Sequence, residues 1–396
     1  MLQFPEVFDK LHDAYLELLE TSGTQLREDF LKIFFRVRAS LIPQLSPGEL
    51  RVFRLALKMQ SLSPGTLASE IGTTKGYVSR IVSGLRRKSM LWEVVRFSYK
   101  ALGLQVLIVM IELNDLDAEL PVPFTRENPW LYSIFDSRMG TRFAIAHFIV
   151  PRSWRSQSEA RAWADKLLEY EQVTNARVFQ RDESACWRHY NYEPFDGQKW
   201  QVTSGLYGPM LRAAFKEPAQ PLETQALEPD LHSFSLDSID IQIIDVLLQE
   251  GPLTIRALRK KLRRDYGLVY KRYTTLKKRN IITTRVIPSP FLAPGLIVIM
   301  AKVDNDDHRR LCNAFKCLPE VYAERTTEEY SVFTLRVPEE HIRTVVDDVN
   351  DIMVGRDRWM TYHGNMHFVS WRLPIDRWME SYKEWRIDEN DFGGPD

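Results

Sequence analysis

Apolar residues recur at helical spacing in two separate stretches of the chain, and each stretch predicts three helices. The third helix of the first stretch carries Val78, Ile81, Val82 and Leu85 on one face. A segment rich in β-branched and aromatic residues follows each set of helices and is typical of a two-stranded wing. Each stretch therefore predicts a winged helix-turn-helix. The predicted helices cover residues 46–60, 64–71 and 74–88 in the first stretch and residues 235–250, 254–262 and 267–278 in the second.

Strand-like and helix-like segments alternate after each predicted wing. The second stretch continues with the strands LIVIMAKVDN, VYAERTT, YSVFTLRV and MHFVSWRL, with helices at residues 308–317 and 339–352. This order, β-α-β-β-α-β, is that of a ferredoxin-like domain. The first stretch has LQVLIVMIEL, RFAIAHFIV and ARVFQRD in matching places, with a helix at residues 158–170 and a less regular first helix.

The two stretches align with each other, which indicates an internal duplication. At a constant spacing of 191 residues, Leu67 matches Leu258, Gly76 matches Gly267, and the cations near Arg86 match those near Lys277. Two diverged copies of one unit explain this agreement. The predicted fold class is α+β. Its parts are a helical extension (residues 1–45), winged helix-turn-helix 1 (46–101), ferredoxin-like domain 1 (102–200), a linker (201–235), winged helix-turn-helix 2 (236–293), ferredoxin-like domain 2 (294–375) and a frayed acidic tail (376–396).

The charge distribution sharpens this picture. The 396 residues carry no net charge, but residues 46–100 hold ten Lys/Arg against three Asp/Glu, and residues 236–293 hold twelve against five. Each window has a net charge of +7 and suits a polyanionic partner. The longest apolar run is too short to span a bilayer, and three cysteines predict no disulfide framework. We expect a cytoplasmic, nucleoid-associated protein.

These features resemble the Lrp/AsnC (feast/famine) family of transcriptional regulators. The residues that carry the resemblance are LDSIDIQIIDVLLQEG and FLAPGLIVIMAKV in the second copy, and LASEIGTTKGYVSRIVSGLRRKSML and YKALGLQVLIVMIEL in the first. The resemblance implies that double-stranded DNA is the partner and that the ferredoxin-like domains pair, here within one chain. The segments SRMGTRF and RTTEEYS differ from the glycine- and aspartate-containing turn of the amino-acid-sensing members, so the effector stays unidentified.

Exposed polar and basic residues of the two helix-turn-helix units are the candidate DNA contacts. The start of the first recognition helix is suited to base edges and its basic end to phosphates, whereas the second unit carries an aspartate that would repel phosphate. Whether the second unit contacts DNA or serves as a scaffold stays open. The candidates are Thr73, Thr74, Lys75, Tyr77, Ser79, Arg80, Arg86, Arg87, Lys88 and Arg96 in the first unit, and Arg263, Arg264, Lys271, Arg272, Lys277, Lys278 and Arg279 in the second.

Two alternatives remain beside a regulator. One is an architectural protein that coats DNA with little sequence preference. The other is a tetrapyrrole enzyme, because siroheme decarboxylases look similar in architecture, and that chemistry calls for histidines or arginines lining a pocket. The eight histidines are scattered, and no nucleophile or phosphate-loop motif is present. The sequence therefore predicts no enzyme, no catalytic residue, no cofactor and no metal. Pairing through the N-terminal extension predicts a homodimer.

Overall fold

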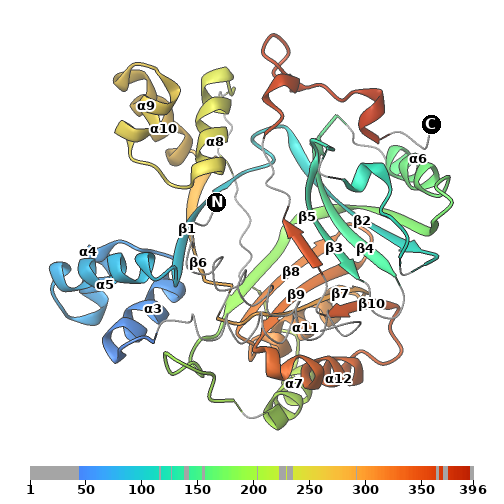
Figure 1. The fold of residues 1–396 in the computed structure, drawn as a ribbon, viewed down its shortest axis with the longest axis horizontal. Helices are drawn as coiled ribbons and strands as arrows, with labels where there is room; N and C mark the ends of the chain where they lie inside the picture. The colour runs from blue at the N-terminus through green and yellow to red at the C-terminus, as the bar shows by residue number, and fades with distance from the viewer. Residues whose placement is uncertain are drawn as a thin grey trace, which may run out of the picture. The chain divides into compact units, whose positions relative to one another are not determined.

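The computed structural model describes most of the chain and has the α+β class that the sequence predicts (Figure 1). The helical extension predicted for residues 1–45 lies, up to residue 43, outside the described residues. The described residues are 44–115, 117–125, 127–137, 142–153, 157–202, 204–222, 229, 235–290, 292–362, 365–368 and 373–392.

The three helices of the first winged helix are α3 (Pro47–Met59), α4 (Pro64–Ile71) and α5 (Lys75–Arg87). Helix α3 begins where it does because the Ser46 side chain accepts from the Glu49 amide, while the Glu49 carboxylate accepts from the Ser46 amide. Helices α4 and α5 have simpler caps, in which the side chains of Ser63 and Thr74 each accept a hydrogen bond from a backbone amide of the first turn. The apolar stripes of the three helices meet in a small buried core that includes Phe53 and Leu67.

The second winged helix repeats the arrangement with α8 (Ser238–Glu250), α9 (Ile255–Leu262) and α10 (Tyr266–Lys278). Their caps are Asp237, Thr254 and Asp265. The buried residues include Ile241, Ile244, Leu258, Val269 and Leu276, which are the positions that the repeat predicts. Local capping and apolar spacing thus determine all six helices.

The prediction that each copy forms its own two-stranded wing is wrong. Each wing segment forms a single strand, β1 (Leu91–Phe97) in the first copy and β6 (Ile282–Pro288) in the second. These two strands pair with each other in a two-stranded sheet, so neither copy has a two-stranded wing of its own. The physical reason is that a strand must satisfy its amide groups, and the duplicated segment supplies an equivalent partner.

Nine strands form one antiparallel sheet in the described part of the chain, in the order β10-β7-β9-β8-β5-β2-β4-β3-β11. Each half of the sheet has the strand order of a ferredoxin-like domain. The first half comprises β2 (Leu104–Leu113), β3 (Leu131–Ser137), β4 (Phe143–Pro151) and β5 (Val173–Tyr190), and the second comprises β7 (Gly295–Lys302), β8 (Glu320–Thr326), β9 (Tyr330–Val337) and β10 (Arg358–Tyr362), with β11 (Asn365–Phe368) at the far edge.

Two strand pairs join the halves within the chain. Strand β5 is long enough for its first part to pair with β2 and its last part with β8. Strand β11 pairs with β3 of the first half, whereas β10 is the last strand of the second ferredoxin-like half. The sequence predicted this last strand at residues 366–373, and the structure corrects it to Arg358–Tyr362. One face of both halves shares a buried cluster, to which Met110 and Phe135 contribute from one half and Met300 and Val332 from the other.

Helices pack on the outer faces of the sheet halves. Helix α6 (Gln157–Leu167) packs against β5, and α11 (Asn305–Phe315) and α12 (Ile342–Ile352) belong to the second half. The first half has the short 3-10 helix η1 (Val122–Phe124) in place of its first α-helix. The other 3-10 helices of the described residues are η2 (Ser204–Leu206), η3 (Glu339–His341), η4 (Ile375–Arg377) and η5 (Glu389–Phe392).

The predicted linker, residues 201–235, contains ordered structure. Helix α7 (Tyr207–Lys216) packs on α11 and α12, as Figure 1 also shows. The approach is close at Gly208, where an added Cβ would lie 2.1 Å from an oxygen of Asp348. Part of the polar stretch therefore belongs to the second ferredoxin-like half, and the tether between the copies is shorter than the sequence predicted.

The predicted frayed tail is packed as well. Strands β12 (Trp378–Met379) and β13 (Glu384–Trp385) form a hairpin. Phe392 is 5% exposed and lies edge-on to Trp163 of α6, with ring centroids 4.8 Å apart. The Trp385 indole donates to the Leu102 carbonyl at 2.6 Å. Aromatic residues among the acidic ones explain the correction, because they bury apolar area that the charge pattern conceals.

Candidate functional site

The candidate DNA contacts of the first winged helix lie on the exposed side of α5. Lys75, Tyr77 and Arg80 are exposed at its N-terminal half, as are Thr73 and Thr74 before it, while Ser79 is half-buried. The Thr74 hydroxyl also accepts from the Tyr77 amide at 3.3 Å. Arg86 and Arg87 are exposed at the other end. Lys88 differs, since its ammonium group lies 2.7 Å from the Glu49 carboxylate in an ion pair.

Some candidate DNA contacts of the second winged helix are exposed, and others interact with neighbouring side chains. Arg272 makes ion pairs with Asp237 and Asp240, so it serves to join α10 to the start of α8. Burial and the charge of Asp237 raise the pKa of Asp240 to about 6. The Lys277 ammonium lies over the Tyr273 ring. Arg279 is half-buried, and the fully exposed candidates are Arg263, Arg264, Lys271, Lys277 and Lys278.

Arg96 belongs to a different site, a polar cluster on and beside the sheet. It is only partly exposed and lies within electrostatic range of Tyr99, Arg188 and Tyr322. We call this group the arginine–tyrosine cluster. Its members are Arg96, Tyr99, Tyr132, His147, Arg181, Arg188, Tyr190, Arg285, Tyr322 and Glu324.

The arginine–tyrosine cluster contains a buried His–Glu pair. His147 on β4 faces the same side of the sheet as Phe143 and Ile145, since alternate residues of a strand share a face. Its Nε2 is 2.5 Å from Oε1 of Glu324 on β8, and its Nδ1 is 3.0 Å from the Ser133 hydroxyl on β3. Both ring nitrogens of His147 are thus engaged, one by each half of the sheet.

Glu324 is held as a carboxylate by the groups around it. Its Oε2 accepts from the Tyr322 hydroxyl at 3.1 Å and from Arg181 Nη1 at 3.3 Å. Burial alone would raise the pKa of Glu324, but His147 and Arg181 outweigh burial and lower that pKa to about 2. Burial raises the pKa of Tyr322, so its phenol stays protonated and remains a donor.

The rest of the cluster is rich in guanidinium groups and aromatic rings. The Arg181 guanidinium lies 5.1 Å from the Tyr99 ring centroid, and that of Arg188 lies 4.8 Å from the Tyr322 centroid. Arg188 also donates to the Tyr190 hydroxyl at 3.2 Å. These contacts are cation–π interactions, in which a guanidinium group lies over the face of an aromatic ring.

Like charges crowd the side of the cluster nearest the paired strands β1 and β6. Burial lowers the pKa of Arg285 to about 9, together with the nearby charges of Arg188 and Arg96. Burial also lowers the pKa of Arg96, and the charge of Arg188 adds to the effect. A bound anion would relieve this repulsion, because opposite charge favours the protonated guanidinium.

The cluster is accessible to solvent at several of its members. Burial is the leading influence on the pKa of Tyr99, Tyr132, Arg188 and Tyr322, yet each of these side chains keeps accessible surface, and Tyr132 is 37% exposed. These groups lie among other protein groups and still reach solvent. The arrangement can bind an anion and hold a proton close to it.

Of the site residues predicted from the sequence, the structure places only Arg96 in this cluster. The other members were missed because they come from five strands (β3, β4, β5, β6 and β8) and from the turn after β1, and no sequence motif links them. The one available signal was the condition stated for a tetrapyrrole enzyme, that histidines or arginines line a pocket. Within the described residues, no three or more His, Cys, Asp or Glu side chains are placed to hold a metal ion. No helix in that part of the chain is long and apolar enough to cross a membrane.

The described architecture defines an α+β chain of two winged helices and two ferredoxin-like halves. No family model and no curated protein matches the sequence. Two solved structures are similar in fold. One is the crystal structure of the siroheme decarboxylase NirDL, with 13% identity and a TM-score of 0.48 over 85% of this chain and 96% of that chain. The other is the same enzyme in co-complex with an iron-uroporphyrin III analogue, with 13% identity and a TM-score of 0.42 over 84% and 95%.

Both similar structures are those of an enzyme, which contradicts the expectation that the chain has no catalytic activity. That expectation is withdrawn. The likeness does not by itself assign an activity, so the proposal below rests on the residues of the arginine–tyrosine cluster.

Proposed function

We propose that the arginine–tyrosine cluster binds a ligand with several carboxylates and that the chain is an enzyme acting on it. The observation that carries the proposal is the gathering of Arg96, Arg181, Arg188 and Arg285 in one cluster with the buried pair of His147 and Glu324, in which Arg181 contacts Glu324. Guanidinium groups bind carboxylates in two-pronged hydrogen bonds. Glu324 pairs with Arg181, and Glu320 lies within electrostatic range of Arg188. Four guanidinium groups against these two carboxylates are suited to a ligand with more than one carboxylate.

The aromatic members of the cluster favour a flat ligand. Tyr99 and Tyr322 present rings on which guanidinium groups already stack, and Tyr132 keeps its own ring accessible. Flat aromatic surfaces stack on such rings. A tetrapyrrole with carboxylate arms combines both properties, and it is the ligand class of the enzyme alternative that the sequence left open.

The reaction that these groups support is decarboxylation of an arm. The bond between the carboxylate and its methylene carbon breaks, CO2 leaves, and the carbon keeps the electron pair and takes up one proton, with no net oxidation. His147, joined to Ser133 and Glu324, is the group placed to supply that proton. Glu324 and Ser133 orient the imidazole, and the arginines hold the arms that do not react.

Ligand binding tests the first part of this proposal. We expect uroporphyrin III to quench the tryptophan fluorescence of the chain with saturation. Arg188→Ala should weaken binding about 10-fold or more, because a hydrogen bond to a charged group contributes about 1.5–3 kcal/mol. Arg161→Ala is the matched control, since Arg161 is exposed on α6. Equal dissociation constants for the two variants would remove the cluster as the binding site.

Turnover tests the second part. His147→Gln should bind uroporphyrin III and iron uroporphyrin III as the parent chain does and should release CO2 at least about 100-fold more slowly, within the range for loss of a general acid. The measurement is CO2 release together with mass spectrometry of the porphyrin. Unchanged turnover in this variant would exclude His147 as the proton donor.

A second candidate function is contact with double-stranded DNA through α5. It is favoured by the exposed polar and basic side chains at both ends of that helix, Lys75 and Arg80 at one end and Arg87 at the other. Binding of duplex DNA should weaken with salt at a log–log slope of about 0.9 per phosphate contact. Arg80→Ala should cost about 1–3 kcal/mol on a preferred sequence, and Arg87→Ala should weaken all sequences alike. No binding at low salt would exclude it.

A further inference from the structure

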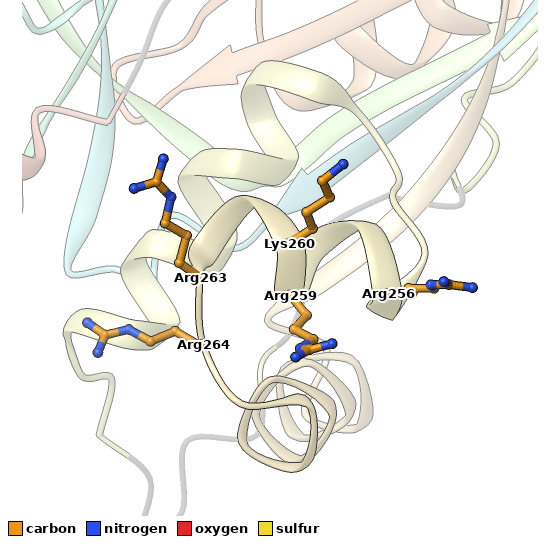
Figure 2. A pocket seen from close by; sticks show the side chains of 5 residues that line it. All are labelled: Arg256, Arg259, Lys260, Arg263 and Arg264. Atoms are coloured by element: carbon orange, nitrogen blue, oxygen red, sulfur yellow. The ribbon is translucent and has the colours of Figure 1, made fainter.

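Five cations line a hollow in the second winged helix that neither proposed function uses. Its volume is about 590 Å³, and its lining residues are Arg256, Arg259, Lys260, Arg263 and Arg264 (Figure 2). Figure 2 shows these side chains spreading in different directions from α9 and the turn that follows it. No carboxylate lines this hollow.

The helix spacing explains why these cations line one hollow although their side-chain ends spread apart. Positions 256, 259, 260 and 263 are three, four and seven residues apart, which is the spacing of a single helix face. Arg263 ends α9 in the left-handed conformation, with φ of 53°, and the chain turns there so that Arg264 joins the same hollow. Like charges at this spacing destabilise a helix by about 0.2–0.5 kcal/mol per pair.

The five cations also lack internal partners among the described residues. No ion pair or side-chain hydrogen bond within that part of the chain involves them. Their neighbour Lys261 behaves differently, because its ammonium lies 2.6 Å from the Glu250 carboxylate and it does not line the hollow. Helix α9 and the turn after it thus hold one neutralised cation, Lys261, and five that can meet an anion.

Two aromatic residues follow shortly after Arg264, the last residue that lines the hollow. Tyr266 and Tyr270 lie one turn apart on α10, stacked with centroids 6.2 Å apart and an interplanar angle of 15°. They are 49% and 52% exposed, which is high for large aromatic side chains. Exposed rings beside a basic groove are the means by which proteins bind single-stranded nucleic acids, with bases on the rings and phosphates on the cations.

The start of α10 is poorly suited to reading a duplex. Asp265 caps the helix with its carboxylate at the end that would enter a major groove. Arg272 on the same helix is held by Asp237 and Asp240. The exposed side chains in and after the hollow include the five cations, Tyr266, Tyr270 and Lys271, with Asp265 as the one carboxylate in residues 256–271. Cations and aromatic rings bind backbone and base faces without reading base edges.

We propose that the second winged helix binds single-stranded nucleic acid, with phosphates in the cationic hollow and bases stacked on Tyr266 and Tyr270. This site is separate from the arginine–tyrosine cluster and from α5, so it goes beyond both proposed functions. It also gives the second helix-turn-helix a role of its own.

Fluorescence anisotropy of the full chain with a labelled oligothymidine of about 16 nucleotides tests the proposal. We expect Arg259→Ala and Arg263→Ala each to lower the log–log salt slope by about 0.7, the value for one phosphate contact on a single strand. Tyr270→Ala should weaken binding about 5-fold or more, and an abasic strand of equal length should bind more weakly than oligothymidine. Lys261→Ala is the matched control and should leave affinity unchanged.

Several results would overturn the proposal. One is affinity for oligothymidine that Arg259→Ala and Tyr270→Ala leave intact while Lys75→Ala removes it, since the first winged helix would then be the site. A second is tighter binding of duplex than of single strand through the same residues. A third is equal binding of oligothymidine, the abasic strand and inorganic polyphosphate, which would make the hollow a site for phosphate alone. Circular dichroism of each variant establishes that it is folded.

Discussion

Glu324 brings one carboxylate to a region dominated by guanidinium groups, and its ionisation stabilises the fold around it. Its pKa of about 2 lies below the ordinary value of 4.5. A carboxyl with a lowered folded-state pKa stabilises the protein above its unfolded-state pKa, and this contribution is lost as the pH falls through the folded-state value. The shift corresponds to about 3 kcal/mol of unfolding free energy at neutral pH.

We therefore predict that Glu324→Gln lowers the free energy of unfolding by about 3 kcal/mol at neutral pH, because Arg181 loses its buried carboxylate. Urea unfolding at a series of pH values measures it. The gap between parent and variant should narrow as the pH falls from about 4.5 toward 2. Glu193→Gln is the control, since the Glu193 carboxylate is largely exposed. A gap that is the same at every pH would show that shape, not charge, explains the loss.

The members of the arginine–tyrosine cluster illustrate why single residues were hard to predict. His147 meets Ser133 because β3 and β4 pair with those two residues in register. It meets Glu324 only because β5 links the halves, with an irregular stretch between Asp182 and Trp187. Strand register and bulges depend on distant partners, and a one-residue shift would turn each side chain to the other face. Sequence spacing alone contains none of this information.

At the scale of elements, the buried His308 makes α11 sensitive to pH. Its Nδ1 is 2.8 Å from the Ser331 hydroxyl of β9, and its ring stacks on Phe333. Burial, with the charges of Arg325 and Arg309, lowers its pKa to about 4. The unfolded chain binds a proton near pH 6.5 and the folded chain does not, so stability should fall as the pH drops from about 6.5 to 4.

His308→Asn should remove this dependence while keeping a polar partner for Ser331. We predict that the parent chain loses about 2 kcal/mol more stability than the variant between about pH 7.5 and pH 5, from the part of the shift that titrates in that range. Urea unfolding at both pH values measures the difference. Parallel losses in the two proteins would exclude His308 as the responsible group.

The elements themselves were largely predictable where their causes are local. The helices expected at residues 46–60, 64–71 and 74–88 correspond closely to α3, α4 and α5, since caps and apolar stripes lie within the segments. The prediction of a two-stranded wing in each copy was wrong because β1 pairs with β6, which lies nearly two hundred residues away in the sequence. The prediction of an unstructured linker was wrong at α7, because the apolar face of this helix packs on α11 and α12, which lie far away in the sequence.

On the scale of the whole molecule, duplication allows one chain to build a sheet across two ferredoxin-like halves. The strand pairs β5–β8 and β11–β3 join the halves, and both use strands that extend beyond their own half. The homodimer that the sequence predicts through its N-terminal extension stays a prediction. Because the two copies have diverged, they supply different residues to the arginine–tyrosine cluster. His147 and Arg181 come from the first copy, and Tyr322 and Glu324 come from the second.

The last described residues, up to Phe392, provide a third connection, because they pack on the first half of the sheet although they follow the second. Phe392 contacts Trp163 and Phe148, and the Trp130 indole donates to Asp391 at 2.9 Å. Phe392→Ala should therefore cost about 3–5 kcal/mol, as for other buried aromatic residues. Tyr382→Ala, which removes a side chain that is 72% exposed in the same segment, should cost almost nothing. Thermal and urea unfolding of both variants measure this contrast, and a frayed acidic tail would instead leave the two variants as stable as the parent chain.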